Sequence, residues 1–225
     1  MQTIINARTC RVKSVKIVAI IITSILLTVV FYHVFVFKNF FQPQIDNESI
    51  EMTFSDDQLT NAPIKDKKSV IKVISYGCKY CASTDEDENQ LIKMLPPDVS
   101  YEVIHVAFSG PLQKMAGIFA TLQVMGEEEK FRPVLYNAVI NQEKDLTNDK
   151  VLNQLLEENG INVAEYHKVS EGGEVESKLK RMATISAFYN IPATPIYIIG
   201  GKHIIEKKDS VTDFANLIKM LVDGK

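Results

Sequence analysis

The apolar residues of this chain form one long uninterrupted run near the N-terminus, followed by shorter periodic segments. The run spans residues 17–37 and contains no charged residue. About 20 apolar residues are enough to cross a bilayer. Basic residues precede the run at Arg8, Arg11, Lys13 and Lys16. By the positive-inside rule, this pattern predicts a cytoplasmic segment at residues 1–16 and a transmembrane signal-anchor at residues 17–37.

A cleaved signal peptide would begin with a similar pattern of basic and apolar residues. The apolar run is longer than the ~7–15 residues usual for a signal-peptide core, and no small-x-small cleavage site follows it. Both features favour an uncleaved anchor in the cytoplasmic (inner) membrane. Everything beyond it is then expected to face the periplasm or the cell exterior. Residues from about 42 to 68 are polar, with Pro43, Pro63 and a charge run, and a stalk is therefore expected at residues 38–68.

Residues 69–225 read as a single domain that begins with strand and helix patterns in alternation. Residues 69–75 and 101–108 are rich in apolar and β-branched side chains, which is typical of buried strands. A helix is expected between them, from about Lys79 to Leu95, where Pro96 and Pro97 end it. A strand, a helix and a second strand in this order predict a parallel β-α-β unit.

In the middle of this domain, the apolar residues recur only with the spacing typical of α-helices. Five helical segments are expected, at residues 112–125, 127–142, 149–158, 163–168 and 174–189. After them, Gly200-Gly201 lies between two apolar runs and predicts a hairpin over residues 195–205. A last helix is expected at residues 211–222. The pattern as a whole predicts an α/β fold with a helical insertion at about residues 111–190.

The charge of the chain is divided unevenly between its parts. Residues 1–38 contain five basic residues and no acidic one, out of 25 basic and 28 acidic residues in the whole chain. The rest therefore has 20 basic against 28 acidic residues, a net charge of −8. A nucleic-acid interface would need clustered Lys and Arg, so this balance argues against a nucleic-acid partner.

The three cysteines of the chain are Cys10, Cys78 and Cys81. Cys10 precedes the apolar run on the cytoplasmic side, where a free thiol is expected. Cys78 and Cys81 enclose only two residues and fall where a strand passes into a helix. A helix N-terminus lowers the pKa of a thiol by stabilising its thiolate. The spacing and this context indicate a redox-active dithiol that exchanges disulfides with other proteins.

Half of a zinc site, or two unrelated core thiols, would be the alternative interpretation of the cysteine pair. Zinc would need two further ligands, and the histidines at positions 105, 167 and 203 form no second close pair. We therefore expect no metal at the dithiol. His105 lies in an apolar strand pattern and is expected to be a hydrogen-bonded core histidine.

Three elements carry a resemblance to a known family. They are Ile74-Ser75-Tyr76-Gly77-Cys78-Lys79-Tyr80-Cys81, the 101–108 strand followed by Ser109-Gly110, and residues 191–202. Over roughly residues 69–222 the chain resembles the DsbA-like thiol-disulfide oxidoreductases of the bacterial cell envelope. The resemblance implies a thioredoxin-like fold with an inserted α-helical subdomain, and the 114 positions from Cys81 to Pro195 leave room for that insertion.

The resemblance also implies roles for individual residues. Cys78 would be the exposed nucleophile and Cys81 the buried resolving thiol. Pro195 would be a cis-proline that exposes the Thr194 backbone to a bound polypeptide. No metal or organic cofactor is implied. The implied partners are exported proteins with cysteines and, as electron acceptor, a DsbB-type quinone-linked membrane oxidase.

Several residues depart from the pattern of strongly oxidising members of that family. Lys72 stands where they have a buried acid, and a Lys72–Glu102 ion pair is one expectation, with two unpaired surface charges as the alternative. Tyr80 stands where they have His, which should weaken the oxidant, although Lys79 adds positive charge. Thr194 replaces their Val, as in related isomerases. The acidic run at residues 85–88 is expected to be a solvated helix face.

These features together predict a membrane-anchored, outward-facing thiol-disulfide oxidoreductase, and an oxidase is the favoured direction. An isomerase or reductase that a membrane donor keeps reduced is the alternative within the same chemistry. A noncatalytic envelope chaperone that uses the peptide groove is the alternative from another class.

Overall fold

The computed structural model describes residues 23, 24, 26, 28, 29, 51–208 and 210–224. The predicted anchor at residues 17–37 lies outside the described residues, apart from five helical and exposed positions. No helix of the described part is long and apolar enough to cross a membrane. The chain divides into two units, Met1–Glu48 and Ser49–Lys225, and the second contains the elements that follow.

The described residues of the second unit form one five-stranded mixed sheet in the order β1-β5-β4-β2-β3. The strands are β1 (Glu51–Thr53), β2 (Ser69–Ile74), β3 (Ser100–His105), β4 (Ile196–Ile199) and β5 (His203–Ile205). β2 and β3 are parallel, and the remaining pairs are antiparallel. The predicted β-α-β unit and the predicted hairpin are both present.

The segment predicted as a stalk contributes to this sheet, which corrects that prediction for its second half. β1 pairs with β5, and Phe54 packs edge-on against Tyr189 with ring centroids 5.4 Å apart. Ala62 and Ile64 are buried. A three-residue edge strand is too short to show an alternating pattern, and only its pairing with distant residues forms it.

The hairpin turn explains why residues near 64 pack so closely against the sheet. Gly200 and Gly201 have φ of +59° and +65°, a region that side chains with a Cβ rarely adopt. A Cβ on Gly201 would lie 2.6 Å from the carbonyl oxygen of Ile64. Glycine is therefore needed both for the turn and for the approach of the preceding segment.

The helix predicted at residues 79–95 is two helices, α2 (Lys79–Ser83) and α3 (Asp87–Met94). The hydroxyls of Ser83 and Thr84 both donate to the carbonyl of Tyr80, at 3.1 and 2.9 Å. Side chains of this type compete with the regular helix ladder. The resulting turn lets two acidic side chains of the run at residues 85–88 face inward.

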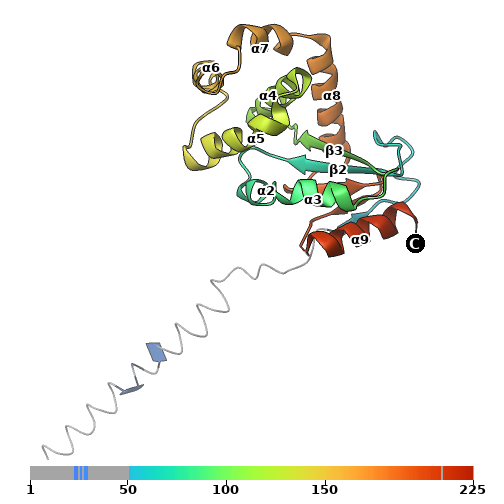
Figure 1. The fold of residues 1–225 in the computed structure, drawn as a ribbon. Helices are drawn as coiled ribbons and strands as arrows, with labels where there is room; N and C mark the ends of the chain where they lie inside the picture. The colour runs from blue at the N-terminus through green and yellow to red at the C-terminus, as the bar shows by residue number, and fades with distance from the viewer. Residues whose placement is uncertain (1–22, 25, 27, 30–50, 209, 225) are drawn as a thin grey trace, which may run out of the picture. The chain divides into compact units, whose positions relative to one another are not determined.

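The helical insertion follows β3 and returns to β4 (Figure 1). Its helices are α4 (Pro111–Met125), α5 (Glu128–Tyr136), α6 (Asp149–Glu158), α7 (Val163–Ser170) and α8 (Gly173–Phe188), with the π-helix η2 (Asn137–Asn141) after α5. The five predicted segments are confirmed, but the one at residues 127–142 changes from α-helix to π-helix midway. The side chains of Asn148 and Asn162 cap α6 and α7 by accepting backbone N–H groups.

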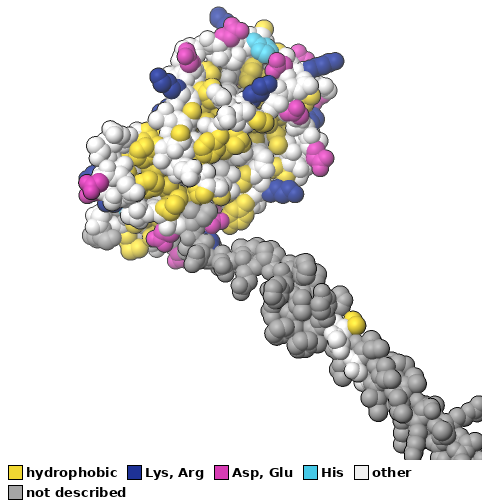
Figure 2. Space-filling model, turned by 180° about the vertical axis from the view of Figure 1, so that it is seen from behind, with side chains coloured by type: hydrophobic (Ala, Val, Ile, Leu, Met, Phe, Trp, Pro, Cys, Tyr) yellow, Lys and Arg dark blue, Asp and Glu magenta, His cyan; other side chains and the backbone are white. Residues whose placement is uncertain are grey.

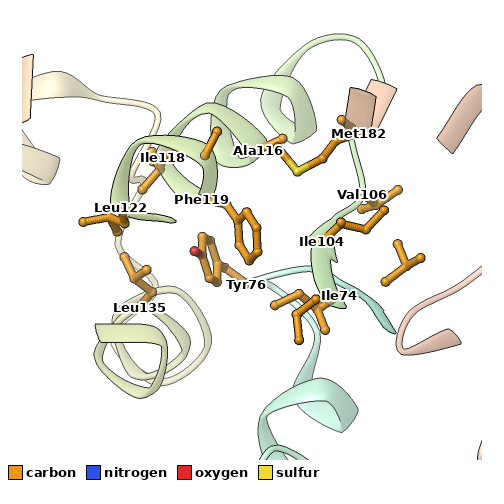
Figure 3. Close-up of a cluster of buried hydrophobic side chains, with 14 of the residues drawn as sticks. Ile74, Tyr76, Ile104, Val106, Ala116, Ile118, Phe119, Leu122, Leu135 and Met182 are labelled. Carbon is orange, nitrogen blue, oxygen red and sulfur yellow. The ribbon is translucent and has the colours of Figure 1, made fainter. Parts of the chain in front are cut away.

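Helices cover both faces of the sheet (Figure 1). On one face, α3 and the C-terminal helix α9 (Val211–Val222) pack against strand residues such as Tyr197, whose ring meets Phe214 edge-on at 4.7 Å. On the other face the larger core joins the sheet to the insertion. In Figure 3, Tyr76 lies beside Phe119 of α4, and Ile74 and Ile104 approach from the strands.

The surface seen in Figure 2 has apolar side chains across its middle, with charged side chains mostly toward its margins. Lys and Arg are scattered on this face and do not gather into a patch. The face therefore lacks the clustered positive charge that binding to a phosphate backbone requires.

Candidate active site

The two cysteines of the second unit are joined in a disulfide bond at the start of α2. β2 ends at Ile74, and a turn follows in which the Cys78 N–H donates to the Ser75 carbonyl at 3.0 Å. Cys78 is the N-cap of α2, and its Sγ accepts the Cys81 N–H at 2.9 Å. Cys78 is partly buried, whereas Cys81 is fully buried. The predicted position of the pair at a strand-to-helix turn is confirmed.

The segment before β4 reaches the disulfide from the far end of the domain. The Thr194–Pro195 peptide bond is cis, as the motif predicted. The Thr194 carbonyl oxygen lies 3.1 Å from the Cys78 Sγ. The structure thus brings together the two motifs that the sequence separates by more than a hundred positions.

The two residues between the cysteines face solvent. Lys79 is exposed, and Tyr80 has an exposed fraction of 49%. Within the described part of the chain, neither side chain forms a hydrogen bond or an ion pair with Cys81. Both positions are therefore open to a partner that approaches the disulfide.

His105 supports the turn that leads to the cysteines. Its Nε2 accepts the Tyr76 backbone N–H at 3.1 Å, and its Nδ1 donates to the Val106 carbonyl at 2.7 Å. These partners require the neutral Nδ1–H tautomer. Burial lowers the pKa of His105 to about 4. The prediction of a hydrogen-bonded core histidine is confirmed.

Lys72 and Glu102 neither pair with each other nor remain unpaired at the surface, so both expectations for these two residues were wrong. In the parallel β2–β3 register, Glu102 lies opposite Ile71, and Lys72 lies opposite Val103. Since neighbouring residues of a strand point to opposite faces, Lys72 and Glu102 point away from each other. Glu102 instead accepts two hydrogen bonds from Arg181, at 2.7 and 2.8 Å.

Lys72 is fully buried and pairs with two acidic residues of the run at residues 85–88. Its Nζ lies 2.9 Å from Glu88 and 3.7 Å from Asp85. The side chains of these two acids are only 10% and 19% exposed. The prediction of a solvated helix face was therefore wrong for Asp85 and Glu88, although Glu86 is exposed.

Arg132 of α5 connects this pair to the helical insertion. Its guanidinium donates to Glu128 at 2.7 Å, to Asp85 at 3.1 Å and to Glu88 at 3.2 Å. Glu128 also accepts the hydroxyl of Tyr76, two residues before Cys78, at 3.1 Å. We call this set the Arg132 cluster. Its members are Lys72, Tyr76, Asp85, Glu88, Glu128 and Arg132.

The protonation of the Arg132 cluster reflects its burial. Burial raises the pKa of Glu128, and the hydrogen bonds and charge of Arg132 oppose that rise. Burial alone would lower the pKa of Arg132, but the hydrogen bonds and charges of its carboxylate partners raise it overall. Arg132 was not predicted from the sequence as a site residue. The only local signal was its spacing of four residues from Glu128 on one helix.

The histidines of the described part lie on three different elements and have different partners. His167 of α7 bonds to Asn153 at 2.9 Å, and His203 of β5 bonds to Thr53 at 3.0 Å. No cluster of three or more His, Cys, Asp or Glu residues that could hold a metal ion occurs in the part of the chain that the structure describes.

A mixed sheet with an inserted set of helices, and a dithiol at a strand-to-helix turn beside a cis-proline, define a protein of the thioredoxin fold. The DSBA-like thioredoxin domain model matches residues 70–219. The chain belongs to this family.

Relatives and solved structures agree with this assignment. The thiol:disulfide interchange protein DsbA of Pseudomonas syringae pv. tomato is 27% identical over 149 residues, 65% of this chain and 70% of that protein. The DsbA of Azotobacter vinelandii is 25% identical over 146 residues, 64% of this chain and 68% of that protein. The crystal structure of Pseudomonas aeruginosa DsbA shares the fold, with a TM-score of 0.64 and 18% identity over 79% of this chain and 91% of that chain. The oxidoreductase NmDsbA1 from N. meningitidis also shares this fold, with a TM-score of 0.61 and 23% identity over 69% of this chain and 82% of that chain.

The Arg132 cluster predicts a ranking of stability losses. Arg132→Met leaves the buried carboxylate of Glu128 without its cation and removes one of the two cations near Asp85 and Glu88, so it should lower the free energy of unfolding by about 3–5 kcal/mol. Lys72→Met should cost less, about 1–3 kcal/mol, because Glu88 keeps Arg132. Glu102→Gln breaks only an exposed pair and should cost less than about 1 kcal/mol. Chemical denaturation of the three variants checks the ranking. A loss for Arg132→Met no larger than that for Glu102→Gln would contradict it.

His105 predicts an acid-sensitive component of stability. The unfolded histidine takes up a proton near pH 6.5 and the folded one only near pH 4, so stability is lost as pH falls through this window. The loss should reach about 3 kcal/mol by pH 4. His105→Gln keeps one donor and one acceptor but does not titrate. Unfolding free energies from pH 7.5 to pH 4 should fall less steeply for this variant, and parallel curves would show that His105 is not responsible.

Proposed function

We propose that this chain is a membrane-anchored thiol-disulfide oxidoreductase that faces the periplasm or cell exterior and passes its Cys78–Cys81 disulfide to cysteines of exported proteins. The observation that carries the proposal is the disulfide itself, placed at the start of α2 with the Thr194 carbonyl 3.1 Å from the Cys78 sulfur. The apolar run at residues 17–37, with basic residues before it, supports the anchor and its orientation.

The burial of the two sulfurs determines which one a substrate attacks. Cys81 is fully buried, so a substrate thiolate attacks Cys78 and the Cys81 sulfur leaves as a thiolate. A second substrate thiolate then attacks the substrate sulfur of the mixed disulfide and releases the Cys78 thiolate. The substrate loses two electrons and forms a disulfide, and the enzyme gains them as a dithiol.

The first turn of α2 stabilises the leaving thiolate of Cys78. The Cys81 N–H donates to this sulfur at 2.9 Å, and this donor is worth more to a thiolate than to a neutral thiol. The positive charge of Lys79 acts in the same direction. Stabilising the reduced form in this way makes the disulfide a stronger oxidant.

Thr194 and Pro195 provide the binding contact for the substrate chain in this proposal. A bound polypeptide pairs with the Thr194 backbone in an extended conformation, as peptides add to exposed main-chain edges. Because the Thr194 carbonyl already touches the Cys78 sulfur, this pairing places a substrate cysteine next to the disulfide.

Turnover as an oxidase needs an acceptor for the two electrons. In this proposal a DsbB-like quinone-linked membrane oxidase reoxidises the dithiol. The alternative is an isomerase or reductase that a membrane reductant keeps reduced. Tyr80 favours that alternative, since an exposed phenol next to Cys81 supplies no positive charge to the Cys78 thiolate.

The redox proposal predicts complete dependence on one cysteine. Cys78→Ser should abolish both activities. Oxidation of a reduced protein substrate is lost because the variant has no Cys78–Cys81 disulfide to be attacked, and reduction of a disulfide substrate is lost because the variant has no Cys78 thiolate to attack it. Cys10→Ser is the matched control and should retain both activities. Full activity of Cys78→Ser would defeat the redox proposal, whereas absence of both activities from the wild type would favour a noncatalytic chaperone that uses only the peptide contact.

The identity of residue 80 should set part of the reduction potential. Tyr80→His adds a cation near the Cys78 thiolate and should raise the potential by about 30 mV, a tenfold change in the equilibrium constant. Equilibration of both proteins with glutathione buffers measures the difference. A wild-type value near that of thioredoxin, about −270 mV, together with a mostly reduced protein in cells, would exclude the oxidase direction. An unchanged value in Tyr80→His would show that the first-turn amide and Lys79 dominate.

A further inference from the structure

A groove of about 530 Å³ lies beside the redox helix, and the chemistry above does not use it. One wall is α2 and the turn after it, with Lys79, Ala82 and Glu86. The other wall belongs to the helical insertion and includes Pro133, Ile140 and Asn141. Neither Thr194 nor Pro195 lines it. The groove is therefore distinct from the backbone contact at the cis-proline, and its volume is within the range of ligand pockets.

The irregular end of α5 shapes the far wall of this groove. Pro133 lies inside α5 and has no backbone N–H to donate. The helix then widens into the π-helix η2, in which the Gln142 N–H donates to the Asn137 carbonyl five residues earlier, at 3.1 Å. π-Helical turns are rare and frequently occur at functional sites. Here the widened turn contributes Asn137, Ile140 and Asn141 to the groove.

The groove lies against the helix whose N-cap residue carries the reactive sulfur. Lys79 directly follows Cys78, and Lys79, Ala82 and Ser83 have the spacing of residues on one face of a helix. The face of α2 that carries Lys79, Ala82 and Ser83 is thus one wall of the groove. Because an extended chain advances about 3.3 Å per residue, the residues next to a cysteine bonded to Cys78 are within reach of Lys79 and of the groove it lines.

The lining favours an extended peptide with an apolar and a basic side chain. Ala82, Pro133 and Ile140 form an apolar surface, and the amides of Asn137 and Asn141 offer donors and acceptors for a peptide backbone. The rim carries one cation, Lys79, and two acids. Asp85 is already bonded to Arg132 at 3.1 Å, whereas exposed Glu86 forms no ion pair within the described part of the chain.

We propose that this groove binds the residues that flank the reactive cysteine of the substrate polypeptide, with an apolar side chain against Ile140 and a basic side chain at Glu86. This inference rests on the proposed function and adds substrate selection to it. Selection by the groove is independent of the bond exchange, because a small dithiol reaches Cys78 without entering the groove.

The first test compares Ile140→Glu with the matched control Ile92→Glu. Ile92 is an exposed isoleucine of α3, with an exposed fraction of 42%, and does not line the groove. The substrates are dithiothreitol and two reduced dicysteine peptides, one with Leu and Lys on both sides of the reactive cysteine and one with Gly and Glu there. For Ile140→Glu, kcat/KM on the Leu/Lys peptide should fall about tenfold through KM, with dithiothreitol unchanged. The Ile92→Glu control should change neither.

The second test reverses the charge at the rim. Glu86→Lys, an exposed substitution, should lower the preference for the Leu/Lys peptide over the Gly/Glu peptide about fivefold, and added salt should weaken the effect. Equal kcat/KM values for both peptides in the wild type, or an Ile140→Glu effect of the same size on dithiothreitol, would overturn the groove proposal. Failure of the wild type to oxidise even dithiothreitol would instead overturn the proposed function. Unfolding midpoints of all variants separate loss of binding from loss of fold.

Discussion

The buried guanidinium of Arg132 is the interaction on which the arrangement of the site depends. It bonds to Glu128 on its own helix, to the turn between α2 and α3 through Asp85, and to α3 through Glu88. Glu88 in turn holds Lys72 of the central strand β2. The helical insertion is thus joined by charged hydrogen bonds to the base of the redox helix. Such contacts keep a fixed geometry because any displacement would leave a buried charge without its partner.

Two supports of different chemistry hold the chain just before the disulfide. The hydroxyl of Tyr76 donates to Glu128 of the Arg132 cluster, and its backbone N–H donates to neutral His105. The ionic support links the turn to the insertion, and the neutral support links it to β3. Cys78, two residues later, is therefore held in place by contacts to both the insertion and β3. This explains how a five-residue helix can present the sulfur of its N-cap residue to Thr194.

Local patterns in the sequence predicted most elements of the fold, because strand alternation and helical period are properties of neighbouring residues. What they missed depends on distant residues. β1 exists only through its pairing with β5, and the break after Ser83 depends on side-chain hydrogen bonds to the backbone. The dithiol and the cis-proline were found because each is a short motif. The Lys72–Glu102 pair was wrong because it needed the β2–β3 register, which no pattern along one strand reveals.

The positive charge of buried Lys72 stabilises the Cys78 thiolate less than an unpaired charge at this position would. Lys72 is fully buried, and a free ammonium beneath the helix would favour the Cys78 thiolate. In this structure, however, its amine lies 2.9 Å from Glu88, so the field of the pair largely cancels at longer distance. The thiolate then depends on the groups that touch it or lie beside it, the Cys81 N–H and Lys79, without help from residue 80. In the proposed reaction, the stability of the Cys78 thiolate is therefore set by the first turn of α2, and the ionic cluster below acts through geometry.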